Sequence, residues 1–151
     1  MFRRLPILIL VLFLLAPTAV FANQAALVVV LQNRTITECV TFEQPVINVI
    51  DLLQLSGLKF TTATFKFGEA VCSIQNTGCQ FPQEPCFCQC TSTSPSCLFF
   101  ALFVLKNGQF EAAHVGESHL IVHDGDVIAL AFGNGTPPPP VTFQQVCGTG
   151  H

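Results

Sequence analysis

The cysteines are the residues of this chain with the clearest chemistry, and two kinds of chemistry are open to them. Cys86, Cys88 and Cys90 alternate along the chain, so on a strand their thiolates share one face and could coordinate Cu(I) or Zn²⁺. In an exported protein the same thiols are expected to form disulfides instead. We therefore predict three separate disulfides and no metal site. Their partners are expected to be the other three cysteines of the stretch, Cys72, Cys79 and Cys97.

The two remaining cysteines lie far apart, near the two ends of the expected domain. Cys39 and Cys147 are predicted to pair and to pin the C-terminal tail to the second expected strand. Closing so long a loop contributes about 4 kcal/mol in the chain-entropy treatment. Eight cysteines allow about 105 pairings in general, so the connectivity inside the cysteine-rich stretch stays open.

Histidines and aspartates offer a second set of candidate ligands. His119 and His123 are four residues apart, which on a strand places them on one face, and His114 lies nearby. They could bind a metal or respond to pH, but no accompanying carboxylate completes a known zinc spacing, so surface histidines are the simpler interpretation. Asp124 and Asp126 flank a glycine; a calcium loop needs more oxygen ligands, and turn chemistry explains the pair better.

The sequence patterns of common catalytic sites are missing from the chain. It has no Gly-x-Ser-x-Gly, no His-Glu-x-x-His and no glycine-rich phosphate loop. Ser118 beside His119 is not a catalytic pair without supporting geometry, and oxidised cysteines cannot act as nucleophiles. We predict that the protein is not an enzyme.

Residues 1–22 are typical of a secretion signal. Arg3 and Arg4 precede a short apolar core over residues 7–16, and Val20 and Ala22 place small side chains before the expected cleavage point. The core is too short to span a bilayer comfortably, since a span needs about 20 residues. We expect an extracytoplasmic protein (secreted, periplasmic or at the cell surface) that touches a membrane only if this segment is left uncleaved.

Composition excludes some partners and favours others. The chain carries a formal charge of −3, only 10% charged residues, and 15 phenylalanines without any tryptophan or tyrosine. A nucleic-acid-binding protein needs a basic patch, and none is present. With so few charges, the surface must include apolar side chains, which favours a small apolar or planar ligand or a protein partner.

Periodicity predicts eight strands and one helix. A helix is expected from about Pro45 to Leu55, with Gly57 as its cap, and Asn107-Gly108 is the best hairpin turn. A last hairpin is expected around Asp124-Gly125-Asp126. The expected strands are 25–31, 35–42, 59–67, 70–74, 98–105, 109–114, 119–123 and 127–132.

This order of elements predicts an α+β fold. The expected architecture is a β-grasp-like mixed sheet packed by one helix, with a disulfide-rich loop inserted over residues 72–97. The predicted domain covers residues 23–133, and a proline-rich C-terminal tail, residues 134–151, is tied back by Cys147.

Three stretches together carry a family resemblance. The chain resembles the DUF4430 family, a β-grasp-type domain similar to the C-terminal domain of transcobalamin-type carriers, and within it an exported bacterial branch rich in cysteine. The stretches are residues 46–57; residues 68–72 with the cysteine spacing that follows to Cys97; and residues 107–110, 115–118 and 124–128.

The resemblance implies a ligand- or partner-binding module outside the cell. In cobalamin carriers the related domain covers one face of the corrinoid, so a corrinoid is the one cofactor that the resemblance raises. Family members often carry tyrosine and tryptophan just after the last loop cysteine, whereas residues 98–103 here are Leu-Phe-Phe-Ala-Leu-Phe. Phenylalanine keeps the flat apolar face but has no hydroxyl or indole donor to orient a polar ligand.

Two functions therefore follow from the sequence. The first is a non-catalytic module that binds a small apolar or planar ligand over phenylalanines on the strands. The second is a structural or protein-interaction domain at the cell surface, in which the cysteine-rich loop recognises another exported protein. The candidate ligand-binding residues are Phe99, Phe100, Phe103, Phe110 and Phe132.

Overall fold

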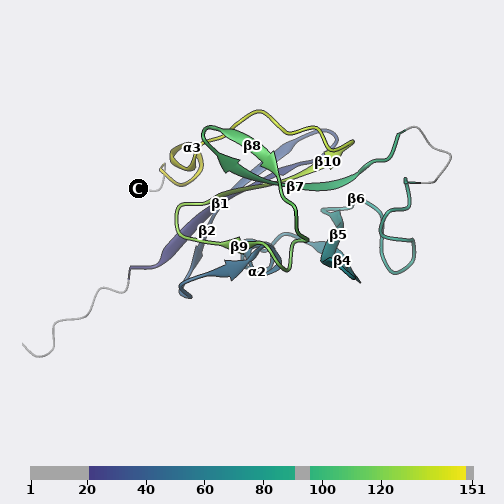
Figure 1. Cartoon of the computed structure of the whole chain (residues 1–151), viewed down its shortest axis with the longest axis horizontal. Coiled ribbons are helices and arrows are strands. Elements are labelled where there is room, and N and C mark those ends of the chain that lie inside the picture. The colour runs from purple at the N-terminus through teal and green to yellow at the C-terminus, as the bar shows by residue number, and fades with distance from the viewer. Residues whose placement is uncertain (1–20, 91–95, 149–151) are drawn as a thin grey trace, which may run out of the picture.

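A five-stranded mixed sheet forms the centre of the molecule (Figure 1). The computed structural model describes residues 21–90 and 96–148, so residues 1–20 of the predicted signal segment lie outside the described residues. The strand order is β2-β1-β10-β7-β8. The strands are β1 (Asn23–Val30), β2 (Thr35–Phe42), β7 (Phe99–Lys106), β8 (Gln109–Ala112) and β10 (Val127–Gly133).

The pairing inside this sheet gives the β-grasp arrangement. β1 and β2 form an antiparallel hairpin, and β7 and β8 form another whose turn is Asn107-Gly108. Both turn residues have positive φ, 50° and 80°, as a tight hairpin of this kind requires. The two hairpins meet through β10, which runs parallel to β1 and antiparallel to β7. The α+β, β-grasp-like fold predicted from the sequence is therefore the fold observed.

One helix, α2 (Val49–Ser56), packs on the first face of the sheet. It begins later than predicted, because Asn48 rather than Pro45 starts it. The Asn48 side chain accepts from the backbone N–H of Asp51, and the Asp51 side chain accepts from the backbone N–H of Asn48. Gly57 ends the helix with a φ of 73°, as the sequence indicated.

Both faces of the sheet are covered, which explains the uninterrupted apolar run of β1. Leu27 and Val29 contribute to the core under α2, while Ala26 and Val28 contribute to a second core on the opposite face. The C-terminal tail covers that second face through a short helix, α3 (Phe143–Cys147), which the sequence did not predict. Figure 1 shows α2 and α3 on opposite sides of the sheet.

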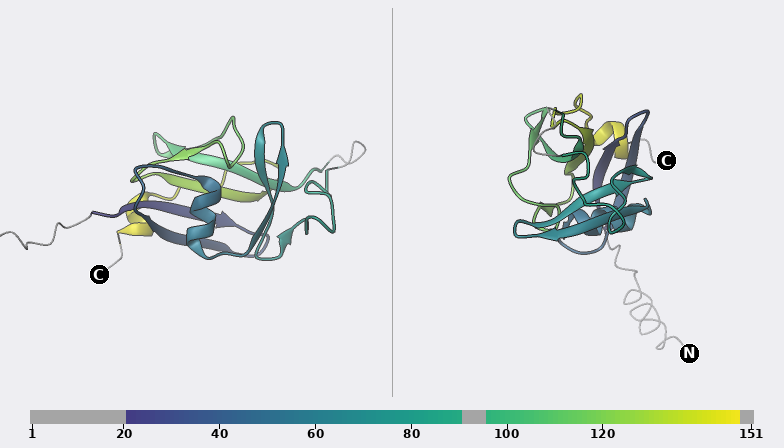
Figure 2. Two further views of the ribbon diagram at one scale, coloured as in Figure 1. Left: turned by 90° about the horizontal axis from the view of Figure 1, so that it is seen from below. Right: turned by 90° about the vertical axis from the view of Figure 1, so that its right-hand side faces the viewer.

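Two small sheets lie outside the main one, so the single sheet expected for all strands is wrong. Strands β4 (Phe60–Phe65), β5 (Gly68–Ile74) and β6 (Thr77–Gly78) form a separate antiparallel sheet, which projects beside the main sheet in Figure 2. Strands β3 (Ile47–Asn48) and β9 (Ile121–Val122) pair with each other.

The hairpin expected around residues 124–126 is also wrong. β9 does not pair with β10, because β10 is already paired on both sides by β1 and β7. The turn docks instead on the start of β1, where the backbone N–H of Gln24 donates to Asp124 Oδ1 over 2.7 Å. Asp126 Oδ2 accepts from the backbone N–H of His123 over 2.8 Å. Both aspartates therefore serve the turn, as turn chemistry predicts.

Four disulfides hold the domain together, which is typical of proteins that fold in an oxidising compartment outside the cytosol. Cys39 is bonded to Cys147, the pair predicted to tie the tail to β2. The other three disulfides are Cys72–Cys86, Cys79–Cys88 and Cys90–Cys97.

Within residues 21–90 and 96–148, no helix is long and apolar enough to cross a membrane.

Candidate functional site

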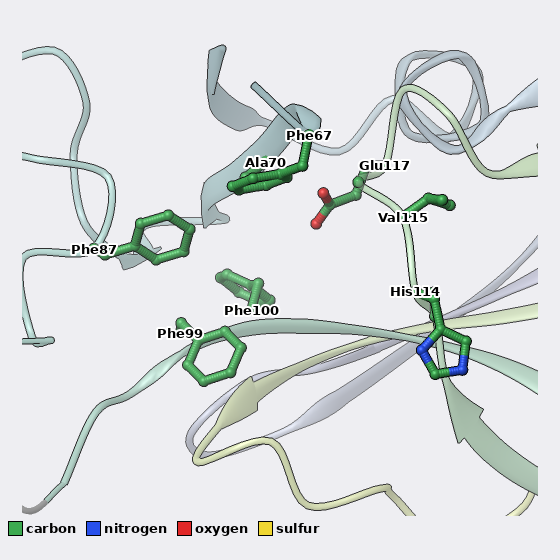
Figure 3. A pocket seen from close by; sticks show the side chains of 10 residues that line it. Phe67, Ala70, Phe87, Phe99, Phe100, His114, Val115 and Glu117 are labelled. Carbon is green, nitrogen blue, oxygen red and sulfur yellow. The ribbon is translucent and has the colours of Figure 1, made fainter. Parts of the chain in front are cut away.

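A pocket of about 300 Å³ opens where the small β4–β5 sheet, the cysteine-rich loop and the start of β7 meet (Figure 3). The segment between β8 and β9 closes its fourth side. A hollow of about 360 Å³ beside α2 is no smaller, but no aromatic ring lines it. The pocket is lined by Phe67, Ala70, Phe87, Phe99, Phe100, Ala113, His114, Val115, Gly116 and Glu117.

Backbone contacts fix the 113–119 segment against the β4–β5 hairpin. The backbone N–H of Glu117 donates to the carbonyl of Glu69 over 3.1 Å, and the backbone N–H of Glu69 donates to Ser118 Oγ over 2.9 Å. His119 Nδ1 lies 2.9 Å from the carbonyl oxygen of Phe67. On the other side, the carbonyl of Glu117 accepts from the first backbone N–H of α2, that of Val49, over 3.1 Å. The pocket wall is therefore held by both the hairpin and the helix.

Gly116 is needed for this close approach. A Cβ atom at this position would lie 2.9 Å from the carbonyl oxygens of both Phe67 and Glu69. Such distances are too short for carbon and oxygen, and backbone oxygens cannot rotate away as a flexible side chain can. Only glycine lets the segment run close enough to the hairpin to bring Glu117 into the pocket.

Phenylalanine rings from three separate parts of the chain are in contact along the pocket. The rings of Phe65 and Phe67, next to the β4–β5 turn, are stacked with centroids 5.2 Å apart. Phe87 of the cysteine-rich loop lies 5.3 Å from Phe65 and 6.4 Å, edge to face, from Phe99 of β7. Contacts at these distances add to the stability gained from burial alone. Because the rings pack on one another, they form a preformed apolar wall.

Disulfides explain why an irregular loop can hold Phe87 in place. Phe87 stands between Cys86 and Cys88, and each neighbour is cross-linked. Cys86 is bonded to Cys72 of β5, and Cys88 is bonded to Cys79 just after β6. The backbone on both sides of Phe87 is thus fixed to the small sheet. The disulfides therefore make the loop a fixed wall of the pocket. Cys86 and Cys88 are oxidised in these bonds, so they are not the thiolate ligands of the metal-site alternative.

Glu117 is the one acidic side chain that lines the pocket, and only 4% of the residue is exposed. Figure 3 shows its carboxylate facing the same space as the rings of Phe67 and Phe100. Burial raises the pKa of this carboxyl above its ordinary value of 4.5. Backbone hydrogen bonds from Glu117 and Val71 lower this pKa and the charge of Glu69 raises it, and burial prevails.

The five phenylalanines predicted from the sequence do not form one surface. Phe99 and Phe100 line the pocket, and Phe132 packs behind Phe100 with ring centroids 5.2 Å apart. Phe103 and Phe110 belong to the core on the face covered by the tail, where they are 0% and 5% exposed. Alternation along β7 separates Phe100 from Phe103, since these two point to opposite faces. Phe99 shares the face of Phe103 but lies at the start of β7, where it contacts Phe87.

The three histidines are used separately. His119 contacts the backbone of the β4–β5 hairpin, His123 Nδ1 lies 3.4 Å from Asp126 Oδ2, and His114 lines the pocket. In the part of the chain that the structure describes, no group of three or more His, Cys, Asp or Glu side chains is arranged to hold a metal ion.

Phe67, Phe87 and Glu117 are among the pocket residues that sequence reasoning did not select for ligand binding. Phe87 and Glu117 lie outside every predicted strand, and Phe67, the last residue of the predicted strand 59–67, lies in the turn after β4. The available signal was local. Glu117 follows a glycine in a chain with few charges, as Glu69 does, and these two Gly-Glu pairs meet in space.

A scan against protein-family models found no match for this chain, and a search of curated proteins found none either.

Proposed function

We propose that this chain is an exported, non-catalytic binding module that holds a small ligand in the phenylalanine pocket. The observation that carries the proposal is the convergence of Phe67, Phe87, Phe99 and Phe100 on one cavity of about 300 Å³. Ligand sites are mostly apolar cavities with few polar groups that fix orientation, and this pocket has only Glu117 and His114 in that role. The resemblance to the DUF4430 family is part of the same proposal.

Preorganisation supports binding here. Two disulfides hold Phe87, and backbone hydrogen bonds hold the Glu117 segment. A site that is already ordered avoids the entropic cost of ordering side chains when the ligand enters. Flat rings on two sides favour a planar or apolar ligand body over a branched polar one.

We propose a ligand smaller than a corrinoid for this pocket. A corrinoid is a large macrocycle that carries many amide groups, whereas the pocket is at the small end of the range for ligand sites. Its lining offers side-chain polar atoms only from His114 and Glu117. The ligand proposed is therefore smaller than the one that the family resemblance suggests.

The first test is a native, non-reducing mass spectrum of the full chain secreted from an oxidising host. We expect the mass of a protein with four disulfides plus one small molecule. Phe87→Ala should abolish the adduct, because Phe87 joins the Phe65 ring to Phe99. Phe81→Ala is the matched control: Phe81 is in the same loop, is 37% exposed and does not line the pocket, so its adduct should remain.

Protein interaction is the second candidate function, and exposed rings near the cysteine-rich loop favour it. Phe67 is 51% exposed and Phe81 is 37% exposed, so both rings are accessible to a protein partner. A bare protein with four disulfides that self-associates in solution, and loses that association in Phe81→Ala, would favour this function over ligand binding.

A further inference from the structure

Glu117 has no cationic partner among the described residues. The two ion pairs of residues 21–90 and 96–148 are Lys106–Glu111 and His123–Asp126, and neither involves the pocket. A carboxylate that is only 4% exposed is costly to bury without a counter-charge. Backbone hydrogen bonds from Val71 and Glu117 satisfy part of this carboxylate but supply no counter-charge, so a cation could still gain from binding there.

The rings beside Glu117 supply half of a cation site. An aromatic ring carries negative electrostatic potential on its face and attracts an ammonium group within about 6 Å of its centroid. Figure 3 shows the rings of Phe67, Phe87, Phe99 and Phe100 around the space that the Glu117 carboxylate faces. A second negative charge lies nearby, since the carboxylate of Glu69 is close enough to raise the pKa of Glu117. An anion would be repelled from this pocket.

We infer that the pocket selects a small organic ammonium ion, which places its charged nitrogen at the Glu117 carboxylate and its apolar body against Phe87 and Phe99. The inference rests on the proposed function and narrows its ligand class. The carboxylate supplies a charge-assisted hydrogen bond to the ammonium N–H groups. The phenylalanines supply the apolar surface and the cation–π attraction.

Three ligands of one shape and different charge test this in the wild-type protein. Benzylammonium, benzyl alcohol and benzoate are titrated by calorimetry at about pH 8, where an ordinary histidine is neutral. We expect benzylammonium to bind about tenfold more tightly than benzyl alcohol, since a hydrogen bond to a charged group contributes more than a neutral one. Benzoate should show no binding.

Two variants assign the effect to one carboxylate. Glu117→Gln should weaken benzylammonium about tenfold, to the level of benzyl alcohol, and leave benzyl alcohol itself unchanged. Glu69→Gln is the matched control, because it removes a nearby negative charge that does not line the pocket. Its effect on benzylammonium should stay below about threefold, because Glu69 lies outside the pocket lining and its charge acts only at a distance.

The outcomes separate this inference from the proposed function. Equal binding of benzylammonium and benzyl alcohol overturns the ammonium selectivity and leaves a ligand-binding pocket. Equal losses of benzylammonium affinity in Glu117→Gln and Glu69→Gln overturn the direct contact between the ammonium and Glu117. The negative potential of the whole region would then explain the preference for a cation. No binding of any probe, together with a bare protein in the mass spectrum, overturns both. The wild-type series decides the question by itself if Glu117→Gln does not fold.

Discussion

Removing the Cys39–Cys147 disulfide should destabilise the domain more than removing any of the short-range disulfides. This disulfide joins residues 108 positions apart and ties the tail to β2. The double variant Cys39→Ala/Cys147→Ala opens that loop. Its matched control is Cys90→Ala/Cys97→Ala, whose cysteines are also half-buried but only 7 positions apart.

The expected magnitude follows from loop length. In the chain-entropy treatment, the 108-residue loop contributes about 4.8 kcal/mol and the 7-residue loop about 2.4 kcal/mol. Because the four cysteines are similarly exposed, the cost of lost packing should be comparable in the two variants. The difference of about 2.4 kcal/mol in the free energy of unfolding therefore measures the difference in loop-closure entropy between the two disulfides. The tail also covers the second core through Phe143 and Val146, which adds to the cost if the tail leaves the sheet.

Urea unfolding measures this difference. Far-ultraviolet circular dichroism is the suitable signal, because the chain has no tryptophan or tyrosine. For a domain of this size, about 2.4 kcal/mol corresponds to a gap of about 1–2 M urea between the two midpoints. Equal midpoints for the two double variants would refute the loop-closure reasoning.

Three further expectations concern single side chains. Gly116→Ala should cost about 1–3 kcal/mol in urea unfolding because the new Cβ meets the Phe67 carbonyl, whereas Gly133→Ala, with open space around it, should stay within about 0.5 kcal/mol of wild type; equal effects would disprove the close approach. Phe103→Ala should cost about 3–5 kcal/mol and the half-exposed Phe67→Ala less than half as much, and the reverse order would contradict the core position of Phe103. Burial raises the pKa of Glu117 in the folded state, so its protonation stabilises the fold below the unfolded value of 4.5, and this contribution is lost as pH rises through the folded pKa. The stability of Glu117→Gln relative to wild type should therefore increase from about pH 4 to about pH 8, and a constant difference would count against a raised pKa.

Local patterns predicted most of the elements correctly. The apolar run of β1, the alternation of β2 and the Asn107-Gly108 turn each depend on residues close in sequence. The cap of α2 at Gly57 is also local, although its start at Asn48 was missed. Helix and strand boundaries follow capping and turn chemistry, so they can be predicted from short windows.

The partners of these elements could not be predicted in the same way. Asp124-Gly125-Asp126 looks like a hairpin turn, yet β10 pairs with β1 and β7, and β9 pairs with β3. The expected β9–β10 hairpin and the observed pairing satisfy the same apolar patterns. The choice between them depends on which faces are buried in the assembled sheet. For the same reason Phe100 lines the pocket while Phe103 and Phe110 lie in the core on the opposite face.

The sequence by itself determined the class of the molecule. Its cysteine content, its alternating apolar runs and its turn residues indicated a disulfide-stabilised α+β domain and the Cys39–Cys147 cross-link. Only the tertiary structure decided the site, because Phe67, Phe87 and Glu117 come from three segments separated in sequence. Burial, disulfide geometry and the close approach at Gly116 bring them together, and these are properties of the folded chain, which no short window of residues contains.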